Sequence, residues 1–341
     1  MNMQDALERL TAGEKLTRGE AREVFGIVMA GEATPAQIAG LLIALRMRGE
    51  STDEVAGAAL AMRAVSTKVD VDVPHLVDTC GTGGSGGAKL FNISTAAAFA
   101  AAPAGAHGAK HGNRGMTSRS GSADVLEAAG VSLDLAPEEI ARCITEVGVG
   151  FLFAQVHHGA MRHAGPVRRE LGVRTVFNVL GPLTNPAGAR RQVIGVFSRE
   201  WQRTLAEVAA LLGAERVLVV HADGLDELSI AGMSHVVELD AGTITEYDVE
   251  PADFGLARHD VAGLRADSPA ASLALVEAAL DATEEAAADI VALNAGAAIY
   301  AAGVTLSLSD GVTMAQDVIA SGQARERLNE LVRMSRLIAA G

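Results

Sequence analysis

The sequence has few aromatic residues, little cysteine and no excess of positive charge. Aromatic residues make up 3% of the 341-residue chain while hydrophobic residues make up 49%, so the core must consist largely of aliphatic and alanine side chains. With a net charge of −14, the chain lacks the basic field that binding to nucleic acid or to a membrane surface requires. We therefore expect neither of these partners, and expect instead small-molecule ligands held in a pocket.

Other absences bear on location. The chain has two cysteines, Cys80 and Cys143, and their spacing indicates neither a metal site nor a redox pair. The first ten residues lack the basic and then apolar pattern of a secretory signal, and no uninterrupted apolar stretch reaches the length of about 20 residues that spans a membrane. These features predict a cytoplasmic protein.

The first 70 residues carry repeated helix-start signals. Thr17 precedes Glu20 by three residues and Ser51 precedes Glu54 by three, as in capping boxes, and Pro35 suits a first helical position. Four short helices are predicted there. The apolar residues of the segment 36–47 have two open interpretations, a dimer face or the core of the domain; they include Leu41, Leu42 and Leu45.

From residue 75 onward, strand and helix patterns alternate, which predicts a mainly parallel sheet. The expected fold class is α/β, with a small N-terminal all-helical domain (1–70) and a larger α/β domain (71–341) that ends in C-terminal helices; helices around 158–186 are expected to pack at the hinge. Expected strands are 75–80, 104–111, 150–154, 193–197 and 216–222, with a hairpin in 236–247. Expected helices are 94–102, 122–129, 137–147, 158–171, 200–212, 270–280, 284–302, 311–320 and 323–338.

The segment 78–124 contains the clearest binding signal. A predicted strand leads into five glycines, and a helix start follows them; the glycines are Gly81, Gly83, Gly84, Gly86 and Gly87. Free backbone N–H groups and the positive end of a helix dipole then point at one place, which favours an anion. A second polar cluster at 110–120 combines cations and hydroxyls, so the ligand should carry more than one phosphate.

Two nucleotide-binding motifs and a zinc site are disfavoured. The segment 81–86 fits G-x-G-x-x-G, but no acidic residue stands about 20 positions later to hold a ribose. Lys89 is followed by Leu90, which excludes a Walker A loop. The histidines His157, His158 and His163 lack the H-E-x-x-H spacing or cysteine ligands of a zinc site.

Six fragments in order carry a family resemblance. They are GTGG at 81–84, NIST at 92–95, KHGNR at 110–114, SGSADVLE at 120–127, the string FLFAQVHHGAMRHAGPVRRELGVRTVFNVLGPLTNP at 151–186, and DGLDELS at 223–229. Together they resemble the anthranilate phosphoribosyltransferases, over nearly the whole chain. The resemblance implies a helical domain plus an α/β domain, a homodimer, an active site at the hinge, and a role in tryptophan biosynthesis.

The resemblance also implies the substrates and the residues that bind them. The family transfers the phosphoribosyl group of phosphoribosyl pyrophosphate (PRPP) to the amino group of anthranilate, with Mg²⁺ as cofactor. PRPP would be bound by Gly81, Thr82, Gly83, Gly84, Ser85, Asn92, Ser94, Thr95, Lys110, Asn113, Thr117 and Ser118. Anthranilate would be bound by Gly81, Asn113, His111, His158, Arg168 and Pro182. The metal would be bound by Ser94, Asp226 and Glu227.

The sequence departs from the family pattern in the glycine loop. Ser85 stands where the family usually has an aspartate after GTGG, and the loop has one more residue before Asn92. This departure bears on the metal arrangement more than on the reaction. No residue is assigned as a single acid or base catalyst. Two alternatives stay open: a pyrimidine nucleoside phosphorylase, and a paralogue that binds ligands without catalysis.

Overall fold

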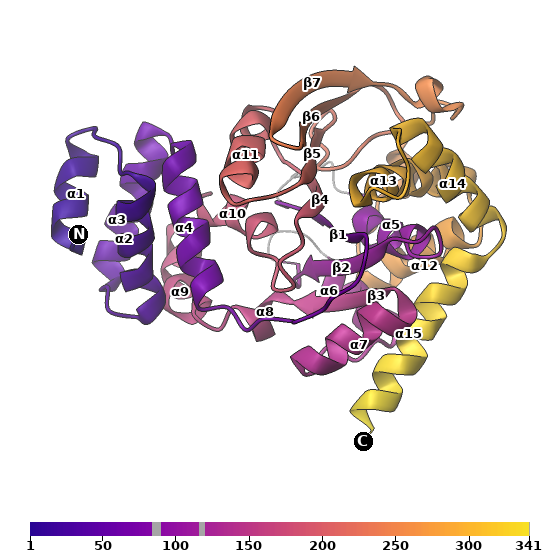
Figure 1. Ribbon diagram of the computed structural model, residues 1–341, viewed down its shortest axis with the longest axis horizontal. Coiled ribbons are helices and arrows are strands. Elements are labelled where there is room, and N and C mark those ends of the chain that lie inside the picture. Colours follow the sequence, from indigo (N-terminus) through magenta and orange to yellow (C-terminus); the bar gives the residue numbers. More distant parts are fainter. Residues whose placement is uncertain (84–89, 116–119, 341) are drawn as a thin grey trace.

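The computed structural model describes residues 1–83, 90–115 and 120–340, and it confirms the expected fold class. An N-terminal helical bundle precedes an α/β part with a central sheet, and the two lie side by side in Figure 1. Four residues of the expected site, Gly84, Ser85, Thr117 and Ser118, lie outside the described residues.

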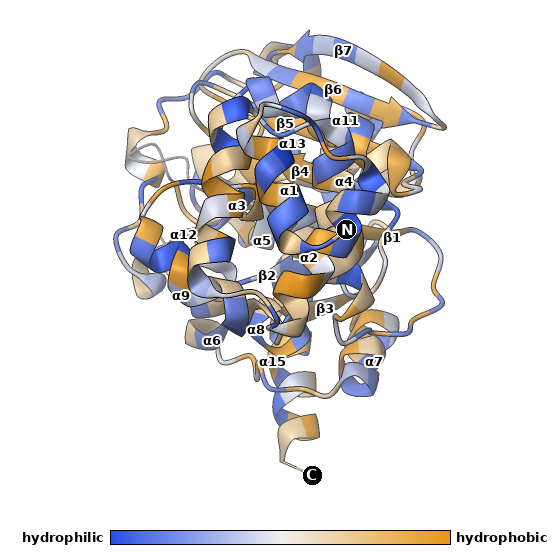
Figure 2. Ribbon diagram, turned by 90° about the vertical axis from the view of Figure 1, so that its left-hand side faces the viewer, coloured by the Kyte–Doolittle hydropathy of each residue, from blue (hydrophilic) through white to orange (hydrophobic). Residues whose placement is uncertain are grey.

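The bundle begins with four helices whose starts follow the capping signals. Side chain and backbone bonds form complete capping boxes at Thr17, Thr34 and Ser51. Leu41, Leu42 and Leu45 are fully buried within this chain, so they belong to the domain core and not to a dimer face. The helices are α1 (Met3–Thr11), α2 (Arg18–Ala30), α3 (Pro35–Arg48) and α4 (Thr52–Ala64). The outward side of α1 is largely hydrophilic in Figure 2.

The central sheet has seven strands in the order β3-β2-β1-β4-β5-β6-β7. The first five are parallel, while β6 and β7 form an antiparallel hairpin that turns at Ala241 and Gly242, both with positive φ. The strands are β1 (Leu76–Gly81), β2 (His107–Gly112), β3 (Val149–Phe153), β4 (Arg191–Gly195), β5 (Arg216–His221), β6 (Ser234–Asp240) and β7 (Thr243–Val249).

Both faces of the sheet are buried at β5, as the continuous apolar run of that strand requires. Val217 and Val219 join one core with the helical bundle and α11, whereas Leu218 and Val220 join a second core with α5 and α13. Figure 1 shows α12, α13, α14 and α15 gathered on the side away from the bundle. The helices not yet given are α5 (Ile93–Ala101), α6 (Ser122–Ala129), α7 (Pro137–Val147), α11 (Glu200–Leu211), α12 (Pro269–Leu280), α13 (Glu285–Ala302), α14 (Leu308–Ala320) and α15 (Gln323–Ala339).

The segment after β3 returns to the helical bundle. It forms α8 (Ala154–His157), α9 (Met161–Leu171), α10 (Phe177–Leu180) and the short 3₁₀ helix Pro182–Thr184. Helix α9 packs against α2 and α3, and the rings of Phe25 and Phe177 meet edge to face with centroids 5.8 Å apart. The single helix expected at 158–171 is therefore wrong at its start, because His158 has a non-helical backbone between α8 and α9.

No helix in the described part of the chain is both long and apolar enough to cross a membrane. Short 3₁₀ turns at Pro251–Phe254 and Ala262–Leu264 complete the connection from β7 to α12.

The close approach of α2 and α4 gives a test of this packing. A Cβ at Gly57 of α4 would lie 2.5 Å from the Arg18 carbonyl oxygen and 2.6 Å from the Ala21 Cβ. We expect Gly57→Ala to destabilise the protein by about 1–3 kcal/mol through overpacking. The control Gly26→Ala, in the middle of α2 with open space around it, should be neutral or stabilising. Thermal unfolding of both variants measures the effect, and equal midpoints would contradict the packing.

Candidate active site

Two glycines at the carboxyl edge of the sheet allow an acidic loop to lie across it. Gly81 of β1 and Gly195 of β4 are register partners at the ends of their strands. A Cβ on Gly195 would lie 1.6 Å from the Asp226 carbonyl oxygen, and one on Gly81 would lie 2.6 Å from Asp226 Oδ2. Any larger residue would therefore displace the segment that carries Asp226. This edge is also where parallel sheets bind ligands.

The acidic pair contacts both halves of the predicted anion cradle. The Gly83 N–H donates to Asp226 Oδ2 at 3.1 Å, and the Ser94 N–H at the start of α5 donates to Glu227 Oε1 at 3.2 Å. Although Glu227 as a residue is half-buried, its carboxyl group lies away from solvent. This burial, followed by the neighbouring charge of Asp226, raises the pKa of Glu227 to about 8.

These residues fit a magnesium ion. Magnesium prefers carboxylate oxygens and is commonly shared with substrate phosphates. Two adjacent carboxyl groups, one with a pKa raised by burial and by the other's charge, would both be stabilised by a cation. Asp226 and Glu227 would hold it, with Ser94 beside them.

Lys110 lies beneath the same edge. Its side chain is 4% exposed, and its Nζ donates to the carbonyl oxygens of Thr79 on β1 and His111 on β2. An ammonium group has three N–H donors. The described residues accept two of them, so the third can donate to a ligand. Lys110 therefore places its positive charge beside Thr79, near the end of β1.

The start of α5 offers fewer free groups than the sequence indicated. Asn92 accepts hydrogen bonds on Oδ1 from Ser120 Oγ at 2.9 Å and Ser272 Oγ at 2.7 Å, so only its amide nitrogen is left for a ligand. Thr95 Oγ1 is buried and has no partner within the described residues.

Thr82, directly after β1, is held to β4, because its N–H donates to the Gly195 carbonyl at 2.8 Å.

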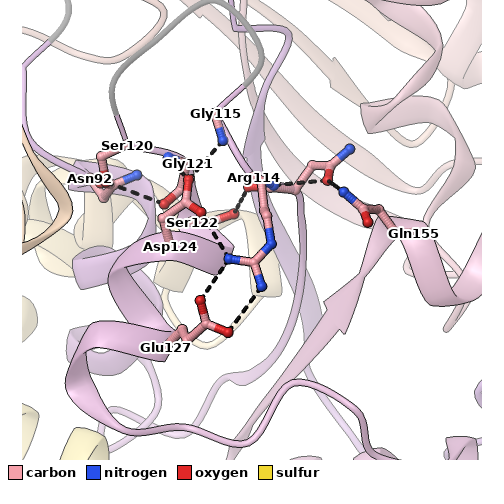
Figure 3. A network of polar contacts seen from close by, with 10 residues as sticks. Asn92, Arg114, Gly115, Ser120, Gly121, Ser122, Asp124, Glu127 and Gln155 are labelled. Atoms are coloured by element: carbon pink, nitrogen blue, oxygen red, sulfur yellow. Dashed lines mark hydrogen bonds and ion pairs between the residues drawn. The ribbon is translucent and has the colours of Figure 1, made fainter. Parts of the chain in front are cut away.

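A carboxylate clamp closes the loop that follows β2 (Figure 3). Asp124 Oδ2 accepts the N–H groups of Gly115 and Gly121, each at 2.8 Å, and its Oδ1 accepts from Arg114 at 3.1 Å. Glu127 binds the same guanidinium at 2.7 and 2.9 Å. Arg114 is thus a structural residue. The sequence motif at 120–127 contained Asp124 and Glu127, yet only the fold shows what they hold.

Asn113 lies at the head of this loop. Its Oδ1 accepts the Arg114 N–H at 2.8 Å and Gln155 Nε2 at 3.3 Å. Gln155 was not expected at the site. The feature of the sequence that could have indicated Gln155 is its position in α8, directly after β3, at the same edge of the sheet.

Two predicted substrate histidines meet beside Lys110. The Nε2 atoms of His111 and His158 lie 3.2 Å apart, and the rings are edge to face with centroids 5.1 Å apart. Burial lowers the pKa of His158 to about 4 and holds the pKa of His111 well below its usual range. Both rings are therefore neutral at pH 7, and His158 Nδ1 is buried without a partner in the described part of the chain.

Arg168 and Pro182 lie on the bundle side. The Arg168 guanidinium stands 5.2 Å from the centroid of the Phe177 ring, and burial lowers its pKa. Within residues 1–83, 90–115 and 120–340, no hydrogen bond or ion pair occupies the Arg168 guanidinium, and none joins it to the histidine pair. Pro182 is buried, and its carbonyl accepts from Gln192 at 2.7 Å.

The helical bundle, the α/β sheet and this polar edge define a glycosyltransferase. The chain matches the helical bundle domain of the glycosyl transferase family over residues 4–66 and its a/b domain over residues 73–325.

Relatives identify the branch. The anthranilate phosphoribosyltransferase of Teredinibacter turnerae is 56% identical over 98% of this chain and 99% of its own, and that of Methylococcus capsulatus is 55% identical over the full length of both. The structure of the Thermus thermophilus enzyme has a TM-score of 0.92 at 49% identity, covering 97% of this chain and 99% of its own. The Saccharomyces cerevisiae enzyme in complex with PRPP and Mg has a TM-score of 0.89 at 25% identity, covering 98% of each chain. The chain belongs to the anthranilate phosphoribosyltransferase family.

The neutral histidine pair gives a pH prediction. Because the folded pKa of His158 is about 4 against an ordinary value of 6.5, its contribution to stability is complete above pH 6.5 and is lost as the pH falls toward 4. The loss should be about 1.4 kcal/mol per pH unit in that window. NMR titration of the histidine ring protons, with His158→Gln to assign the signal, measures the pKa. A midpoint near the ordinary value would contradict the burial described.

Proposed function

We propose that this protein transfers the phosphoribosyl group from PRPP to the amino group of anthranilate and releases pyrophosphate, a step in tryptophan biosynthesis. The observation that carries the proposal is the convergence of three groups at one edge of the sheet. The glycine segment that begins at Gly81, the acidic pair Asp226–Glu227 and the buried Lys110 all lie where a metal-bound diphosphate would need them.

We propose specific roles for the PRPP-facing residues. Breaking the C1–O bond develops positive charge on the ribose and negative charge on the pyrophosphate, so the protein's main task is electrostatic. The N–H groups of the glycine loop and of the α5 start would hold the pyrophosphate, and Lys110 would neutralise part of its charge. The full proposed set is Gly81, Thr82, Gly83, Gly84, Ser85, Asn92, Ser94, Thr95, Lys110, Asn113, Thr117 and Ser118.

The metal proposal follows from the acidic pair. Asp226 and Glu227, with Ser94, would hold Mg²⁺, which when bound supplies positive charge to the pyrophosphate leaving group. The S. cerevisiae relative is in complex with PRPP and Mg, which supports binding of this metal together with PRPP.

Anthranilate would approach from the side of the bundle. Arg168 has a planar fork that can pair with the carboxylate of anthranilate at two points, and no described residue occupies that fork. The neutral rings of His111 and His158 would face the aromatic amine, with Gly81, Asn113 and Pro182 lining the pocket. A neutral imidazole avoids placing a second positive charge beside the developing one on the ribose.

No single acid or base is required in this scheme. An aromatic amine that attacks a ribose carbon with developing positive charge is activated mainly by being held in line. The histidines therefore act by position and hydrogen bonding.

We also propose the domain limits 1–70 and 71–341, with residues 158–186 at the hinge, and a homodimer in the cytoplasm. Packing of α9 against α2 and α3 supports the hinge assignment. The two cysteines, which are free and buried, suit a reducing compartment.

Fluorescence of anthranilate tests the function directly. Incubation with PRPP, Mg²⁺ and anthranilate should consume anthranilate and release pyrophosphate. Phosphorolysis of a pyrimidine nucleoside without anthranilate consumption would select the phosphorylase alternative, and binding without any chemistry would select the non-catalytic paralogue.

The role of Arg168 can be separated from general charge effects. Lysine keeps the charge but loses the bidentate fork, so Arg168→Lys should raise the KM for anthranilate about tenfold and leave the KM for PRPP within about twofold. The matched control is Arg169→Lys, the neighbouring exposed arginine on α9. Steady-state kinetics with each substrate varied would reveal the difference. An unchanged KM for anthranilate in Arg168→Lys would refute the assignment.

A further inference from the structure

The hydrogen-bond ladder between β1 and β2 stops short of the site. The two strands pair at Leu76↔His107 and Val77↔Gly108, whereas β2 stays paired with β3 as far as Gly112. At its start the ladder has the His107 N–H donating to the His75 carbonyl at 3.0 Å. If the ladder between β1 and β2 continued with the same spacing, the His111 N–H would donate to the Thr79 carbonyl.

Two charged side chains instead form hydrogen bonds with these two backbone groups. The His111 N–H donates to Asp78 Oδ1 at 3.0 Å, and the Thr79 carbonyl accepts from Lys110 Nζ. Asp78 Oδ2 accepts from Asn185 Nδ2 at 2.8 Å, and the same amide donates to the Ala109 carbonyl at 2.9 Å. The carboxylate and the ammonium thus bridge the two strands where the backbone ladder ends.

Both groups are buried, which makes each dependent on the other. Asp78 is fully buried and Lys110 is 4% exposed, and an isolated charge in such a place is strongly destabilising. Burial raises the pKa of Asp78, and the positive charge of Lys110 is the largest of the influences that lower it. The Asp78 charge therefore stabilises an ammonium group at this depth.

We infer that Asp78 is a positioning residue for PRPP binding: it opens the sheet between β1 and β2 and holds the Lys110 ammonium at the carboxyl edge. This inference rests on the proposed function, because Lys110 is there assigned to PRPP. Asp78 itself does not touch the substrate. It acts by fixing where the positive charge of Lys110 stands.

A double-mutant cycle on PRPP binding tests the inference. Asp78→Asn keeps the size of the side chain and removes its charge, and Lys110→Met removes the ammonium. Calorimetric titration with PRPP and Mg²⁺ should show that each variant weakens binding by about tenfold or more, and that the double variant is no weaker than the worse single one. Asp240→Asn, at the end of β6, is the matched control and should bind normally.

The alternative outcomes are distinct. If Asp78 only stabilises the fold, the two losses multiply in the double variant, and the inference is overturned. If Asp78→Asn does not fold, Asn185→Ala replaces it in the cycle, because it removes the Nδ2 donor that holds the Asp78 carboxylate and leaves the carboxylate itself in place. Wild-type protein that fails to bind PRPP would contradict the proposed function itself, whereas normal wild-type binding with multiplying losses would overturn only the role of Asp78.

Discussion

The site depends on one close contact, the passage of the Asp226 segment over the ends of β1 and β4. Gly81 and Gly195 are register partners, and neither position has room for a side chain. Because the segment lies so close to the strands, Asp226 reaches the Gly83 N–H and Glu227 reaches the Ser94 N–H. One backbone contact therefore joins the acidic pair to both the glycine segment and the start of α5.

Burial of charge is the second constraint on this edge of the sheet. Glu227, Asp78 and Lys110 are removed from water in a small region, where electrostatic interactions are stronger than at the surface. Such groups are stable only when each has a partner. Asp78 and Lys110 each have hydrogen-bond partners, and their opposite charges influence each other. A metal-bound diphosphate would stabilise the Glu227 carboxylate and accept the remaining N–H of Lys110. The site is thus complementary to a ligand that carries both signs of charge.

The sequence predicted the fold well because its local signals agree with the tertiary structure. Capping boxes at Thr17 and Ser51 mark real helix starts, and the alternation after residue 75 yields the parallel sheet. Gly195 and Asp78 could not be found in this way. Gly195 matters because the segment at Asp226, far along the chain, lies against it, and Asp78 matters because the β1–β2 hydrogen-bond ladder ends early. The sequence does not indicate the break at His158 either, since the helical pattern continues through it while the ring packs against His111.

Magnesium dependence of PRPP binding tests the central claim most directly. Calorimetric titrations of the wild type with and without Mg²⁺ are compared with those of a variant carrying Asp226→Asn and Glu227→Gln. The account predicts that Mg²⁺ tightens PRPP binding to the wild type by about tenfold or more and has little effect on the variant, because the metal's carboxylate ligands are gone. An equal Mg²⁺ effect in both proteins would show that the acidic pair at the ends of β1 and β4 does not hold the metal.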